Sequence, residues 1–127
     1  MDFRLTKAIN NWMEEKNIMN DCDIISIAGV VKEIALNKDS EAAKFILSQI
    51  ELSKKLHDIQ TLYLIHHTDC GAYGGHSAFD DLEEEKNKHI KDMNAAKVII
   101  EENIDGVQVK LVLADMKDDG VIDIGEI

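Results

Sequence analysis

Residues 61–66, TLYLIH, form the stretch that most restricts how this chain can fold. The run is apolar and lacks the polar alternation that marks a strand with one face in water. A short apolar run of this kind is typical of a strand that is covered on both faces. Such strands occur in parallel sheets with helices packed on either side, so the run predicts an α/β fold.

The rest of the chain alternates between helix-like and strand-like patterns. Apolar residues at helical spacing predict helices at 5–17, at 40–56 with Ser40 as the N-terminal cap, and at 79–103. Apolar or β-branched runs predict strands at 23–29 and 107–114, and a short strand at 121–124. We therefore expect one domain over residues 1–127, with a mainly parallel sheet of three or four strands flanked by helices. No strand pattern precedes the first helix.

The charge and composition of the chain argue against two classes of partner. Acidic residues outnumber basic ones by 25 to 14 and give a formal net charge of −11, whereas affinity for a phosphate backbone comes from clusters of Lys and Arg. The apolar runs are far shorter than the ~20 residues of a membrane span, and the N-terminus has no signal-peptide pattern. The two cysteines, Cys22 and Cys70, are too few for a disulfide framework. We expect a cytoplasmic protein with no nucleic-acid or membrane partner.

The stretch HHTDCGAYGG, residues 66–75, begins at the end of the central apolar run. In parallel α/β sheets the functional residues lie beyond the carboxyl ends of the strands. His67 and Cys70 are separated by two residues, so a tight turn can direct both side chains at one zinc ion, and Gly71 lets the chain turn there. The spacing fits equally well a hydrogen-bonded histidine near a small buried cysteine. A third possibility is a thiol enzyme in which Cys70 is the nucleophile and His67 its base.

The string HTDCG after an apolar strand resembles the second zinc motif of the β-class carbonic anhydrases. Members of that family carry Cys-x-Asp-x-Arg at the end of their first strand, and this chain begins with MDFRL at residues 1–5. The family then has a strand that runs into Arg-Asn-Ala-Gly, where this chain has SIAG at residues 26–29. The order, the spacing and the strand-end placement agree over most of the chain.

This resemblance implies a zinc enzyme that interconverts carbon dioxide and bicarbonate. His67 and Cys70 match two of the family's three protein ligands. Asp2 and Arg4 match its catalytic pair, in which the carboxylate binds either the zinc-bound water or zinc itself and the arginine holds the carboxylate. Zinc would lower the pKa of its water to about 7. Family members build their sites at dimer interfaces, so the resemblance also implies a homo-oligomer, a dimer or larger.

Departures from the family pattern leave an alternative function open. The third ligand would be a cysteine immediately before Met1, and the family's first strand would lie further upstream, so we expect either a longer protein or a truncated relative whose sheet a second chain completes. Ser26 and Ile27 replace the family's Arg-Asn and remove a charge and an amide near the site. The alternative is a non-catalytic member with an incomplete zinc site that serves as a binding or assembly module.

The other histidines carry weaker signals. His66 should point to the opposite face of the strand from His67 and pack at the strand end, because adjacent strand residues alternate. His76 is expected to be a surface histidine, with proton shuttling as the alternative. His57 and His89 fall in charged helical stretches and carry no specific signal.

The C-terminal stretch, residues 115–126, matches part of a calcium-binding loop pattern. Lys117 places a cation where a ligand oxygen is required, and no helix pattern follows. We therefore expect a turn at residues 118–120 between two strands.

Overall fold

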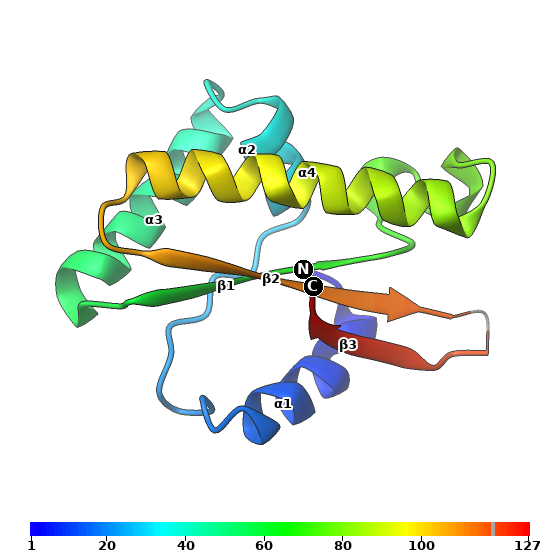
Figure 1. Cartoon of the computed structure of the whole chain (residues 1–127), viewed down its shortest axis with the longest axis horizontal. Coiled ribbons are helices and arrows are strands. Elements are labelled where there is room, and N and C mark those ends of the chain that lie inside the picture. The colour runs from blue at the N-terminus through cyan, green and yellow to red at the C-terminus, as the bar shows by residue number, and fades with distance from the viewer. Residues whose placement is uncertain (118) are drawn as a thin grey trace.

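The computed structural model of the chain describes residues 1–117 and 119–127 (Figure 1). Its elements follow in this order: the 3-10 turn η1 (Phe3–Leu5), α1 (Thr6–Glu15), α2 (Val30–Leu36), α3 (Glu41–His57), β1 (Thr61–His67), the 3-10 turns η2 (Gly71–Tyr73) and η3 (His76–Ala78), α4 (Leu82–Asn103), β2 (Gln108–Met116) and β3 (Ile122–Glu126). The three predicted helices correspond to α1, α3 and α4. The strands predicted from residue 61 onward correspond to β1, β2 and β3.

The sheet is mixed, with the strands in the order β1-β2-β3 among the described residues. β1 and β2 are parallel, in a register that runs from Thr61 opposite Gln108 to His67 opposite Ala114. β3 is antiparallel to β2, with Val112 opposite Glu126. The expectation of a mainly parallel sheet is therefore correct only for the first pair. A connection as short as the one after β2 can return the chain only antiparallel, because a parallel return needs a long crossover.

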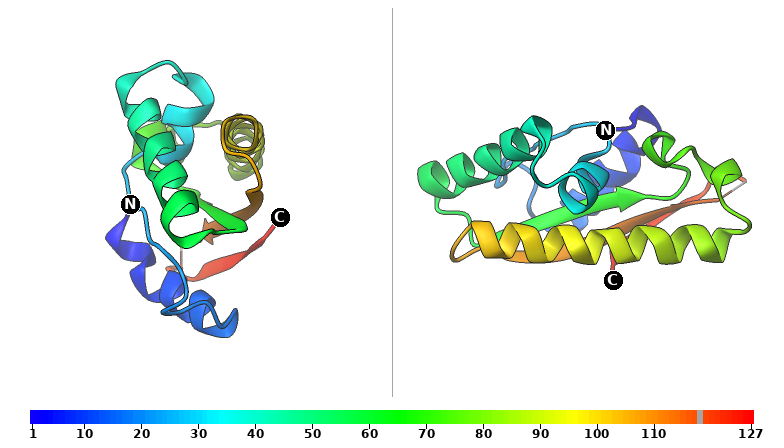
Figure 2. Two further views of the ribbon diagram at one scale, coloured as in Figure 1. Left: turned by 90° about the vertical axis from the view of Figure 1, so that its left-hand side faces the viewer. Right: turned by 90° about the horizontal axis from the view of Figure 1, so that it is seen from above.

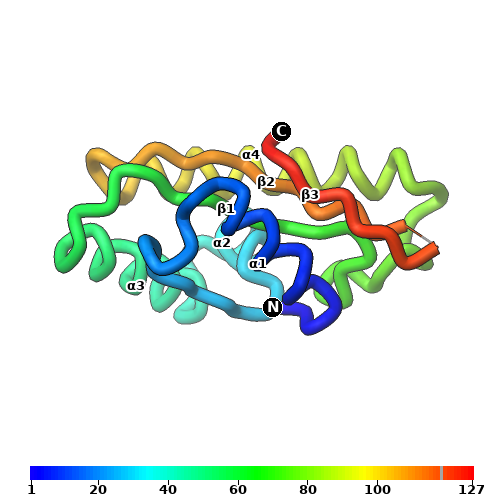
Figure 3. Tube along the Cα trace, turned by 90° about the horizontal axis from the view of Figure 1, so that it is seen from below, coloured from blue at the N-terminus to red at the C-terminus, as the bar shows by residue number. Residues whose placement is uncertain are grey.

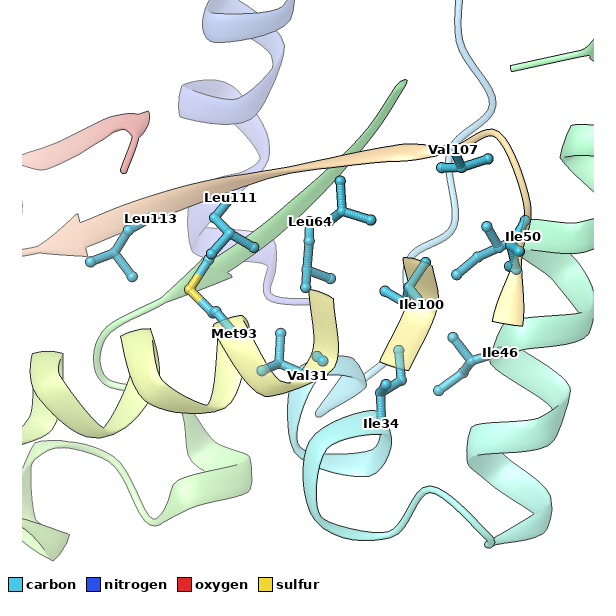
Figure 4. Close-up of a cluster of buried hydrophobic side chains, with 13 residues drawn as sticks. Val31, Ile34, Ile46, Ile50, Leu64, Met93, Ile100, Val107, Leu111 and Leu113 are labelled. Atoms are coloured by element: carbon cyan, nitrogen blue, oxygen red, sulfur yellow. The ribbon is translucent and has the colours of Figure 1, made fainter. Parts of the chain in front are cut away.

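The two parallel strands are covered on both faces, as the apolar run predicted. Figures 1 and 2 show α2, α3 and α4 over one face of the sheet and α1 over the other. The larger core lies under α2, α3 and α4, where β1 contributes Leu64 (Figure 4). On the opposite face Trp12 of α1 packs edge-on against Tyr63 of β1, with ring centroids 5.1 Å apart. Burial from both sides therefore fixes β1 in the middle layer of the molecule.

The strand predicted at 23–29 does not form, which corrects the sequence interpretation. Residues 23–27 are assigned to no strand or helix, and Ile24 and Ile25 are 70% and 39% exposed. A strand needs a neighbour to complete its hydrogen-bond ladder, and no described strand lies on the outer edge of β1 to provide one. The segment is instead tied by contacts from outside it, such as the bond from the Met1 amino group to the Ile27 carbonyl.

A helix that the sequence analysis missed follows this segment. α2 starts directly after Gly29, which has a φ of 66°, and it buries Val31 and Ile34 in the larger core. Its seven residues make only two turns, too few for a periodic pattern to stand out.

The C-terminal stretch forms a hairpin, which agrees with the turn expected between two strands. Gly120, with a φ of 82°, donates its N–H to the Lys117 carbonyl. Lys117 forms an ion pair with Asp123, so this carboxylate is already matched with a cation. Asp118, which belongs to the expected turn, lies outside the described residues.

The cap of α3 gives a test of the fold. Ser40 Oγ accepts a hydrogen bond of 3.0 Å from the Ala43 N–H, so Ser40→Ala should lower the free energy of unfolding by about 1 kcal/mol. Ser48→Ala is the control, because Ser48 lies exposed in the same helix and its change should stay within about 0.5 kcal/mol. Urea unfolding followed by circular dichroism measures both. Equal losses would contradict the cap.

Candidate functional site

A pocket of about 570 Å³ lies at the carboxyl end of β1. Its lining comes from three separate stretches of the chain: Met1, Asp2 and Arg4; Ile27 to Val30; and, within residues 65–75, Ile65 to His67, Asp69 to Ala72, Gly74 and Gly75. Figure 3 shows the N-terminal turn beside the segment that leaves β1. The three stretches singled out in the sequence, at residues 1–5, 26–29 and 66–75, therefore meet at one place.

The turn after β1 has a defined hydrogen-bonding pattern. Thr68 extends the parallel ladder by donating its N–H to the Ala114 carbonyl, and its hydroxyl accepts from the Met116 N–H at 2.8 Å. Asp69 then adopts a left-handed conformation with a φ of 54°, which is uncommon for a residue other than glycine. The Cys70 carbonyl accepts from the N–H groups of Tyr73 and Gly75. The reversal at Asp69 places Cys70 back at the pocket.

His67 is oriented by its own neighbour. It is 7% exposed, and its Nδ1 lies 2.7 Å from the Thr68 carbonyl oxygen. Because a carbonyl oxygen can only accept, Nδ1 carries the proton and Nε2 keeps a lone pair. Burial lowers the pKa of His67, partly offset by the bond to Thr68, so the ring is neutral near pH 7. A neutral imidazole with its other N–H fixed to a carbonyl has the form in which histidine binds metals.

Cys70 is a free thiol that is 5% exposed and lines the same pocket. A histidine nitrogen and a cysteine sulfur suit zinc in donor type. Within residues 1–117 and 119–127, however, no group of three or more His, Cys, Asp or Glu side chains could hold a metal ion. Asp2 therefore does not complete a three-donor cluster with His67 and Cys70. The described part of the chain offers two donors that fit zinc, and no third donor beside them.

Asp2 and Arg4 form the pair expected from the sequence. Arg4 Nη2 lies 2.6 Å from Asp2 Oδ2, and Arg4 Nε lies 3.0 Å from Asp2 Oδ1. The guanidinium also reaches the turn after β1, with Nη1 2.6 Å from Asp69 Oδ2. Mainly through its bond with Arg4, the pKa of Asp2 falls from 3.8 to about 2. Arg4 thus links the N-terminal stretch to Asp69, one of the two residues between His67 and Cys70.

A buried polar cluster behind the pocket was missed by the sequence analysis. Glu85 and His89 of α4 are both fully buried, and Asp92 is 3% exposed. His66 points toward this cluster, with its Nε2 3.0 Å from His89 Nδ1, and burial lowers the pKa of His66 to about 3. The Tyr73 hydroxyl donates to Asp92 Oδ2 at 2.9 Å. The signal in the sequence was the four-residue spacing of Glu85 and His89, which places both on one side of a helix.

The remaining candidates lie elsewhere. Cys22 is exposed and does not line the pocket. His57 pairs with Asp23 at 2.7 Å, while His76 Nδ1 lies 2.5 Å from Glu85 Oε2 and so joins the buried cluster.

Across the described ranges, no helix has the length and apolar character that crossing a bilayer requires.

The fold and site together define an α/β protein with a His-x-x-Cys pair at the end of a parallel strand and an Asp-Arg pair beside it. Residues 1–119 match the family described as "Putative carbonic anhydrase", and the chain belongs to this family. An uncharacterized protein of Rickettsia bellii (strain RML369-C) is 30% identical over 126 residues, which cover 97% of this chain and 76% of that protein. An uncharacterized protein of Rickettsia conorii (strain ATCC VR-613 / Malish 7) is 28% identical over 126 residues, covering 97% and 67%. No solved structure gives a significant match.

The contact between Asp2 and Arg4 predicts how the pKa of Asp2 changes when Arg4 is replaced. Arg4→Gln should raise the pKa of Asp2 from about 2 toward 3.8, because the bond to Arg4 is the main cause of the shift. A carboxyl with a lowered pKa in the folded state stabilises the fold above its unfolded pKa, and this contribution is lost as the pH falls from about 4 to about 2. Titration of the Asp2 carboxyl carbon by NMR measures the shift. Lys7→Gln, which removes an exposed cation from α1, is the control and should leave the pKa of Asp2 unchanged.

Proposed function

We propose that the pocket at the end of β1 binds zinc through His67 Nε2 and Cys70 Sγ, and that the protein interconverts carbon dioxide and bicarbonate. The meeting of residues 1–5, 26–29 and 66–75 at one pocket carries this proposal. Membership of the carbonic anhydrase family supports it. The neutral, oriented ring of His67 supplies the donor chemistry.

The other positions around the metal are proposed to be filled from outside the described cluster. Two protein donors leave a four-coordinate ion open to water, substrate and any further protein ligand. The family pattern expects that further ligand to be a cysteine directly before Met1. Bound zinc would supply an acidified water as the nucleophile near neutral pH.

The residues around the donors have distinct proposed roles. Because the pKa of Asp2 is about 2, its carboxyl is ionised throughout the neutral range and can accept a hydrogen bond from a nucleophile. Arg4 holds Asp2 through a two-point contact and restricts its rotation. The apolar side chains of Ile27, Val30 and Ile65 line the same pocket and suit an uncharged substrate such as carbon dioxide.

A non-catalytic role is the second candidate. It is favoured by the finding that the described side chains include no cluster of three metal donors. The uncharged Ser26 and Ile27, which stand where the family has Arg-Asn, favour it as well. In this case the fold is kept and the pocket serves as a binding or assembly surface.

Metal analysis of ligand variants tests the proposal. His67→Ala and Cys70→Ser should each weaken zinc binding by at least about 100-fold, because losing a group that merely supports a ligand already costs about 10–100-fold. Cys22→Ser removes the exposed cysteine and should bind zinc as the unmodified chain does. Equilibrium dialysis against zinc measures binding, and stopped-flow hydration of carbon dioxide measures activity.

The two candidates give different outcomes in the same experiment. Zinc binding together with hydration activity supports the enzyme, and zinc binding without hydration supports the non-catalytic role. The test is repeated on a form extended at the N-terminus by a cysteine directly before Met1, the position at which the family pattern expects the third ligand. Absence of zinc from both forms would show that the zinc proposal is wrong.

A further inference from the structure

Glu85 is a buried carboxyl group that bonds to two distant points of one loop, at Asp69 and at His76. It lies in the first turn of α4, after the cap residue Asp81, and its side chain is fully buried. Burial of an isolated carboxylate is strongly unfavourable unless hydrogen bonds or charges compensate for the lost water. The described residues provide Glu85 with no Lys or Arg partner, so its bonds to the loop and to His89 must provide that compensation.

The partners of Glu85 lie at the two ends of the loop that carries Cys70. Glu85 Oε1 accepts from the Asp69 N–H at 2.6 Å, at the start of the loop. Glu85 Oε2 lies 2.5 Å from His76 Nδ1, at its end. A third contact, 3.3 Å from Oε1 to His89 Nε2, ties the carboxylate to its own helix. One rigid side chain therefore bridges α4 to both ends of residues 69–76.

The loop depends on outside bonds of this kind because its backbone is held in an uncommon conformation. Asp69 has a φ of 54°, a conformation that costs a non-glycine residue free energy unless neighbouring bonds stabilise it. The Asp69 side chain accepts from the His76 N–H at 3.1 Å, which closes the loop on itself. A Cβ added at Gly75 would come within 2.8 Å of Asp69 Oδ1. The loop is thus closed tightly, and Glu85 is its anchor on the helix side.

The same side chain is connected to the strand that carries His67. His89, bonded to Glu85, also bonds to His66, which directly precedes His67 in β1. The position of Cys70 relative to His67 is therefore set from two directions, by Arg4 at the surface and by Glu85 from within.

We propose that Glu85 is a positioning residue that holds the Cys70 loop in register with His67, and that without it Cys70 is released from its buried position. The consequence for zinc rests on the proposed function. The consequence for the exposure of Cys70 does not, because it follows from the bonds to Asp69 and His76 alone.

Alkylation of Cys70 in metal-free protein tests the proposal directly. In a Cys22→Ser background, which leaves Cys70 as the sole thiol, Glu85→Gln should raise the rate of reaction with iodoacetamide by about tenfold or more, because loss of one charged hydrogen bond favours local opening. Glu83→Gln makes the same change at an exposed position of the same helical turn and should leave the rate unchanged. Equal rates in the two variants would overturn the proposal.

Two further measurements separate positioning from a general loss of stability. The alkylation rate of Glu85→Gln should stay flat in low concentrations of urea, since local opening exposes little surface, whereas a steep rise would indicate global unfolding and contradict the proposal. If Glu85→Gln does not fold, His76→Ala replaces it, since this change removes the outer end of the bridge and keeps the bond from Asp69 to Glu85, and it should raise the rate by a smaller factor. An unchanged rate in that variant would also contradict the proposal.

Cobalt binding separates this inference from the proposed function. Cobalt placed between His67 and Cys70 should give a thiolate charge-transfer band, which Glu85→Gln should weaken relative to Glu83→Gln. If the band is absent from the unmodified chain, the proposed metal site is wrong, while the alkylation rates still decide the role of Glu85. If the band is present and both variants retain it fully, with equal alkylation rates, the positioning role is wrong and the metal site stands.

Discussion

The parallel pairing of β1 with β2 is the constraint on which the rest of the structure depends. It runs without interruption from Thr61 opposite Gln108 to His67 opposite Ala114, and Thr68 extends it by one more bond. Because helices cover both faces of β1, a slip of one residue would exchange the side chains that face the two cores. The pairing therefore determines where the strand ends and which way His66 and His67 point, and both settle the location of the pocket.

Much of this arrangement could be predicted from local patterns. β1 and β2 carry enough apolar residues to be recognised alone, and the Ser40 cap marks the start of α3. Residues 23–29 have the composition of a strand but remain unpaired, because pairing depends on a neighbour and not on the segment itself. The class of fold was therefore predictable, whereas the number and direction of the strands depended on contacts that no single segment encodes.

The residues of the candidate site also fall into two groups, those whose position could be predicted from the sequence and those whose position could not. The shared location of His67 and Cys70 at one pocket was predictable because their spacing and strand-end position are local, and that of Asp2 and Arg4 because they match a family motif. The buried position of Glu85 was not predictable, since it lies in the acidic run DDLEEEK, which has the composition of a solvated helix face. The four-residue spacing to His89 places Glu85 on the same side of α4 as that histidine, but the burial of Glu85 depends on the approach of the loop, which leaves Glu83 and Glu84 exposed.

The bonds that order the loop are separate from the donor atoms that suit zinc. A metal ion often orders the loop that supplies its ligands, but here Arg4 and Glu85 already bind Asp69 from opposite sides. These bonds hold the residue directly before Cys70, which is itself 5% exposed. The features that suit zinc are instead the donor atoms, a neutral His67 with Nε2 available and a thiol on the same pocket. Because the bonds of Arg4 and Glu85 to Asp69 involve neither the His67 nor the Cys70 side chain, a chain with other residues at these two positions could keep the same loop.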